Sequence, residues 1–138
     1  MSETPEGRRL RLADAVAARE RGSRVHIRVA LADADGTHEG EAAGVGTETV
    51  ELRLAAEATL AAIHAAIGAP RFRLLGIKLL HAFDEDVVLA VLRDLERDVA
   101  GRLIGAVPLR GRTLARGAAA ALLDATNRLT SGTGPDGD

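Results

Sequence analysis

Apolar residues recur at helical spacing near the end of the chain. One stripe between Thr113 and Leu129 consists of Leu114, Ala118, Leu122, Ala125 and Leu129. Steps of three and four residues place such positions on one face of an α-helix. A similar stripe occurs 62 residues earlier, at Leu52, Ala56, Leu60, Ile63 and Ile67. The pattern therefore predicts two equivalent helices in a tandem repeat.

Three extended segments precede the first predicted helix. Charged and apolar residues alternate from Arg9, and again over 25–31, as in strands with one buried face. Gly22 marks the turn between these strands, and Asp35-Gly36 marks a hairpin turn. The predicted strands cover 9–19, 25–31 and 37–45, and the helix covers 49–67. The first unit is thus βββα.

The second unit repeats this order, with strands from 71, over 87–92 and over 102–109, and a helix from 113. At the offset of 62, Val87 falls on Val25, so the odd-numbered residues of 87–92 are expected to face the helix. The even-numbered residues Val88, Ala90 and Leu92 are apolar too. A strand that is apolar on both faces is typical of burial on both sides. We therefore expect these three residues to form the interface of a homodimer or larger assembly.

The predicted fold class is α+β, a tandem βββα-βββα repeat. It has two antiparallel three-stranded sheets and two alanine-rich helices, related by a pseudo-twofold axis. Either unit alone would leave a sheet face bare, so we expect both to form one domain. The expected boundaries are a flexible leader at 1–7, one domain at 8–130 made of repeats 8–69 and 70–130, and a disordered tail at 131–138.

Composition narrows the classes of function. The net charge is −2, with one lysine, Lys78, against seventeen arginines, so neither nucleic acid nor an anionic membrane is an expected partner. Cysteine is absent, which excludes disulfides and thiol chemistry. No apolar run reaches membrane-spanning length. The bias toward arginine, alanine and glycine is typical of a GC-rich bacterial genome, and we expect a cytoplasmic protein.

Glycine-containing loops that end in threonine precede both predicted helices. Free N–H groups at a helix N-terminus favour a carboxylate or another anion, and an arginine in the second loop adds a cation. The candidate ligand-binding residues are Gly44, Gly46, Thr47, Gly111, Arg112 and Thr113. The alternative is that the glycines only allow strand-to-helix turns, which the threonines cap. No cofactor and no metal are predicted.

Other polar residues have simpler interpretations. His26 and Arg28 share the outward face of the second strand, on a solvated face or in a polar groove. His64 lies beside the helical stripe and is expected at the surface. The acidic runs at 33–35 and 84–86 carry groups suited to acid–base work or a divalent cation, but they lie in turns, where Asp forms local hydrogen bonds. No nucleophile motif is present, so the sequence predicts a protein that is not an enzyme.

Two βββα units, each with a glycine-containing loop before an alanine-rich helix, resemble the C-terminal regulatory domain of the 2-isopropylmalate synthase and homocitrate synthase family. The run that ends in Asn127-Arg128-Leu129 is similar to the final helix of that domain. Gly44-Val45-Gly46 resembles the Gly-x-Gly before its first helix. The resemblance covers about residues 9–130, and the family's catalytic barrel has no counterpart here. It implies a regulatory, dimerising, non-catalytic module.

Two functions fit these observations best. The first is a non-catalytic small-molecule-binding or regulatory module that dimerises and senses a metabolite. The second is a structural or assembly protein that acts only through protein–protein contacts. A small enzyme and a double-stranded RNA binder are weaker alternatives, the latter because a basic helix N-terminus and a lysine patch are absent. A pocket lined by Gly46 and Gly111 would favour the first function, and a filled interior with a large apolar interface would favour the second.

Overall fold

The computed structural model describes residues 9–96 and 101–130, and it contains two βββα units. The first unit contains β1 (Arg11–Arg19), a 3₁₀ turn η1 (Arg21–Ser23), β2 (Arg24–Asp33), β3 (Gly36–Val45) and α2 (Glu48–Ile67). The second contains β4 (Phe72–Ala82), β5 (Glu85–Asp94), β6 (Arg102–Pro108) and α3 (Leu114–Thr130). The predicted fold class is confirmed, while the predicted leader and tail lie outside the described residues.

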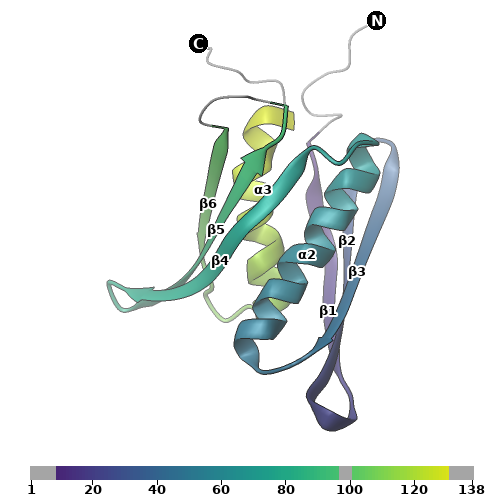
Figure 1. The fold of residues 1–138 in the computed structure, drawn as a ribbon. Coiled ribbons are helices and arrows are strands. Elements are labelled where there is room, and N and C mark those ends of the chain that lie inside the picture. The colour runs from purple at the N-terminus through teal and green to yellow at the C-terminus, as the bar shows by residue number, and fades with distance from the viewer. Residues whose placement is uncertain (1–8, 97–100, 131–138) are drawn as a thin grey trace, which may run out of the picture.

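Each unit forms one antiparallel sheet with its middle strand in the centre. Strands β1-β2-β3 form sheet A, and strands β4-β5-β6 form sheet B. The two helices lie side by side between the sheets (Figure 1). Helix α2 packs on β2 and β3 and also contacts β4, whereas α3 packs on β5 and β6 and also contacts β1. Each helix therefore covers its own sheet and touches the first strand of the other unit.

This position explains why the helices are rich in alanine. A helix between two sheets is enclosed on more than one side, and small side chains let the backbones approach closely. The alanines that are fully buried or nearly so are Ala55, Ala56, Ala58, Ala62, Ala115, Ala118, Ala119, Ala121 and Ala125. The predicted stripe of α3 is buried at Leu122 and Ala118, but the buried face is broader than one stripe.

The offset between the repeats changes from strand to strand. Strands β1 and β4 each bulge, after Leu12 and Leu74, at the predicted offset of 62. Leu12 pairs with Leu31, and Leu74 pairs with Leu92, so β2 and β5 differ by 61. Five residues separate the paired residues Arg19 and Val25, whereas four separate their counterparts His81 and Asp86. The predicted match of Val87 with Val25 is therefore wrong by one residue.

This shift reverses the two faces of β5. Val88, Ala90 and Leu92 are 0% exposed in the single chain. Val88 faces α3, since a Cβ on Gly117 of that helix would lie 3.1 Å from its Cγ2 atom. The prediction that these three residues form an interface between copies is wrong, because α3 covers them. The apolar face that no helix covers carries Val87, Leu89 and Val91 instead, all half-buried.

Candidate functional site

The loop before α2 is closed by the protein's own groups. The Gly46 N–H donates to the Ser23 carbonyl oxygen at 3.1 Å. A Cβ at Gly46 would lie 2.6 Å from Val50 Cβ, and one at Gly44 would lie 3.3 Å from a methyl group of Leu54. Thr47 precedes the helix without a side-chain capping bond. Gly44 and Gly46 thus fit the helix against the sheet, and the Gly46 donor is already used.

The loop before α3 is a capped turn. Thr113 Oγ1 accepts a hydrogen bond from Arg116 N at 3.2 Å, as an N-cap side chain does. Gly111 has a φ of 79°, which favours glycine. Arg112 is exposed, and its N–H donates to the Leu109 carbonyl oxygen at 3.0 Å. No hydrogen bond or ion pair among the described residues joins this loop to the one before α2.

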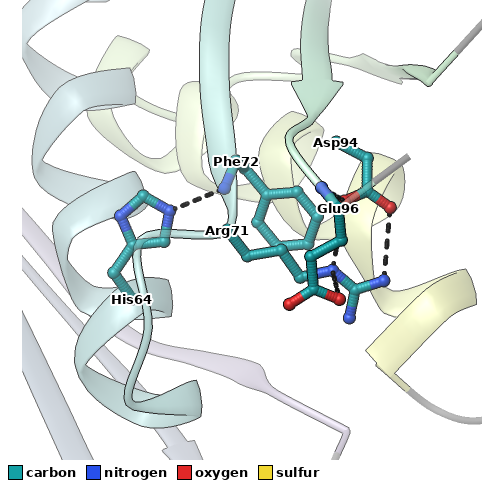
Figure 2. Close-up of polar contacts among 5 residues, drawn as sticks. All are labelled: His64, Arg71, Phe72, Asp94 and Glu96. Carbon is teal, nitrogen blue, oxygen red and sulfur yellow. Dashed lines mark hydrogen bonds and ion pairs between the residues drawn. The ribbon is translucent and has the colours of Figure 1, made fainter. Parts of the chain in front are cut away.

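A polar cluster lies where the first unit ends and the second begins (Figure 2). His64 Nε2 accepts a hydrogen bond from the Phe72 backbone N–H at 3.0 Å, and the two rings stack with centroids 6.2 Å apart. A backbone N–H can only donate, so this imidazole is neutral with its proton on Nδ1. Burial lowers the pKa of His64 below its ordinary value. The expectation of a plain surface histidine is therefore wrong, since His64 joins α2 to β4.

The same junction holds a buried carboxylate. Asp94 is 0% exposed, and both of its oxygens accept from the Arg71 guanidinium, at 3.2 Å each. Asp94 Oδ1 also accepts from Glu96 N at 3.0 Å. The Arg71 guanidinium lies 5.3 Å from the centre of the Phe72 ring. The cluster is satisfied internally, so it has the character of a structural junction.

The repeat supplies an equivalent of the His64 contact at the other junction. Asn127 of α3 binds both backbone groups of Leu10, with Leu10 N 3.3 Å from Oδ1 and Nδ2 3.0 Å from Leu10 O. Asn127 follows His64 by 63 residues, and Leu10 precedes Phe72 by 62. Each helix thus binds the start of the other unit's first strand. No sequence motif marks these contacts, because the partners are backbone atoms.

The remaining polar candidates form local pairs. His26 and Arg28 do share the outer face of β2, where His26 Nε2 lies 2.7 Å from Glu41 Oε1. In the first acidic turn, Asp33 accepts from Asp35 N at 2.9 Å. In the second, Asp86 lies 3.0 Å from His81 Nδ1. Over the described ranges, no three acidic or histidine side chains gather as they would around a metal ion.

The face of sheet B that no helix covers carries several large apolar residues. Alternation and register place on it the residues that point away from α3, which we call the outer face of sheet B: Arg73, Lys78, Leu80, Glu85, Val87, Leu89, Val91, Arg93, Arg102, Ile104 and Ala106. Ile104 is 57% exposed and Leu80 is 41% exposed. At the tip of the β4–β5 hairpin, Phe83 is 98% exposed. The β4–β5 hairpin extends beyond the end of β6 (Figure 1).

Sheet A differs on the corresponding face. The residues of β2 and β3 that point away from α2 include His26, Arg28, Glu39 and Glu41. The large apolar residues on this face are Val16 of β1 and Val45 at the end of β3. Two sheets with the same topology thus present different outer faces. Apolar side chains at both exposed and half-buried positions of a single face are typical of a binding surface.

In comparisons with known proteins, no family model and no curated protein matches the chain. The resemblance to the regulatory domain of the 2-isopropylmalate synthase family therefore stays a prediction. Among the helices that the structure describes, none is both long and apolar enough to cross a membrane.

Proposed function

We propose that this protein is a non-catalytic assembly module that binds protein through the outer face of sheet B. The observation that carries the proposal is the difference between the centres of the two outer faces. That of sheet B presents Val87, Leu89, Val91 and Ile104, while that of sheet A presents His26, Arg28, Glu39 and Glu41. Removal of apolar side chains from water lowers the free energy, so a surface that covers the apolar residues of sheet B is bound favourably by the hydrophobic effect.

The sequence favours two functions, metabolite binding and assembly. The geometry of the two loops before the helices argues against metabolite binding there. The Gly46 N–H is bonded within the chain, and the Val50 side chain fills the space beside Gly46. Thr113 serves α3 as a cap. A carboxylate ligand would have to displace these contacts. Binding of a metabolite at these residues stays a prediction without support from their geometry.

The test is the size of the particle that contains the chain in a cell extract. Tagged wild-type chain is expected to elute well above the size of one tagged copy, of which the chain itself contributes 14.4 kDa. Ile104→Glu places a charge on the outer face of sheet B and should return the chain to the size of a monomer. Val16→Glu is the matched control, because Val16 is 50% exposed on the outer face of sheet A. A monomeric wild type, or an Ile104→Glu chain that keeps the larger size, would contradict the proposal.

A further inference from the structure

The outer face of sheet B carries a charge pattern that is complementary to itself. Along the central strand β5 the outward residues are, in order, Glu85, Val87, Leu89, Val91 and Arg93. Reversal of the strand about Leu89 places Glu85 opposite Arg93, and Val87 opposite Val91. A twofold interface pairs each residue with a mate from the same patch. This order of acidic end, apolar middle and basic end therefore suits a contact with a second copy.

The basic end of the face is wider than one residue. Arg73 and Arg102 lie directly beside Arg93 on the neighbouring strands. Like charges directly opposite one another destabilise a sheet, and no ion pair among the described residues involves any of these three arginines. At the other end, Glu85 contacts Arg110 of its own chain at 3.1 Å, with both side chains exposed. The basic row is the part of the face that needs an anionic partner.

We propose that this face binds the same face of a second copy of the chain, with a twofold axis across β5 at Leu89, and that Glu85 of each copy faces the basic row of the other. The inference rests on the proposed function, since it names the partner of the surface defined there. An axis along β5 would instead bring Arg93 onto Arg93 and Glu85 onto Glu85. The charges select the first arrangement.

Ordinary sheet geometry accommodates the pairing. Packed sheets lie about 10 Å apart and cross at about 30°. Glu85 is four residues from Leu89, or roughly 13 Å along the strand. The crossing angle displaces it sideways by about one strand spacing, where Arg73 or Arg102 replaces Arg93 as the nearest cation. Lys78 lies on the edge strand β4, from which its long side chain can reach solvent.

The experiment is sedimentation of purified chains that carry reversed charges. Wild type should form a dimer at tens of micromolar. Arg93→Glu and Glu85→Arg should each weaken dimerisation about tenfold or more, because each change occurs twice across the axis. A mixture of the two variants should form a heterodimer, since both contacts are then opposite in charge. Arg28→Glu, the same change on sheet A, is the control and should dimerise as wild type does.

A wild-type monomer would overturn the inference, and so would a mixture that associates no better than its separate components. Circular dichroism of each variant shows that it is folded, and Arg93→Glu leaves the Glu85–Arg110 contact in place. The two proposals fail separately. If the purified chain is monomeric but its complex in cell extract still depends on Ile104, the partner is not a second copy. The proposed assembly function would then still hold.

Discussion

Gly40 of β3 and Gly105 of β6 hold the same position in the two repeats, each directly beneath the backbone of its helix. A Cβ at Gly40 would overlap the Ala58 carbonyl oxygen and lie 2.6 Å from Ala62 N. One at Gly105 would overlap the Ala121 carbonyl oxygen and lie 2.7 Å from Ala125 N. Both helices therefore rest on their sheets through contacts that only glycine permits.

Gly105→Ala and Gly40→Ala should each lower the free energy of unfolding by at least about 1–3 kcal/mol, because the helix must move away from the sheet. Urea denaturation measures this. Gly76→Ala is the control, since a Cβ there meets nothing within 4 Å. It should be neutral or slightly stabilising. If Gly105→Ala unfolds at the same urea concentration as wild type, the helix does not contact β6 as described.

Leu60 and Leu122 hold equivalent positions in the sequence repeat, but they differ in burial. Leu122 is fully buried, whereas Leu60 is half-buried. Leu122→Ala should cost about 2–5 kcal/mol through the cavity that it leaves, and Leu60→Ala should cost clearly less. Arg116→Ala, whose exposed ion pair with Asp14 spans 3.3 Å, should stay within about 1 kcal/mol. Thermal and urea unfolding of the three variants measure this order. The prediction is contradicted if Leu60→Ala is the most destabilising of the three.

His64 should make stability depend on pH. Burial lowers its folded pKa, so between that value and the ordinary 6.5 the unfolded chain binds more protons than the folded one. Its contribution is complete above pH 6.5 and decreases as the pH falls below it. His64→Asn copies Asn127 of the other junction and should reduce the loss of stability between pH 7.5 and 5.5. Equal losses in both proteins would show that His64 is not the group responsible.

Arg71→Ala should destabilise the fold by about 1–3 kcal/mol, because it removes both guanidinium bonds from a carboxylate that is 0% exposed. Arg93→Ala, which has no such partner, is the control and should change stability by less than about 0.5 kcal/mol. Chemical denaturation at pH 7.5 distinguishes the two. Equal stability of both variants would mean that the Asp94 contact contributes nothing net.

Sequence patterns identify the architecture here because each helix and each strand pair repeats. They fail at the β5 faces for a physical reason. Residues 87–92 are all apolar, so alternation carries no information on which face is inside. Register then depends on the length of the connection between the strands, which is one residue shorter from His81 to Asp86 than from Arg19 to Val25. A shift by one residue exchanges the two faces of a strand.

The junction contacts were beyond sequence reasoning for a different reason. His64 and Asn127 bind backbone atoms, whose positions depend on the assembled fold rather than on residue type. A signal was present for Asp94, which follows Asp33 by 61 residues, the true offset of the second strands. In both, Oδ1 accepts from the N–H two residues later. A comparison of the two repeats that allows each strand its own offset would align Asp94 with Asp33.

Site-specific photo-cross-linking tests the assembly function most directly. A photo-reactive p-benzoyl-phenylalanine in place of Leu89 lies at the centre of the outer face of sheet B, and one in place of Val16 lies on the outer face of sheet A. After irradiation of living cells, position 89 should give a cross-linked protein adduct and position 16 should give none. Adducts from position 16 alone, or no adduct from position 89, would contradict the assignment of the outer face of sheet B as the binding surface.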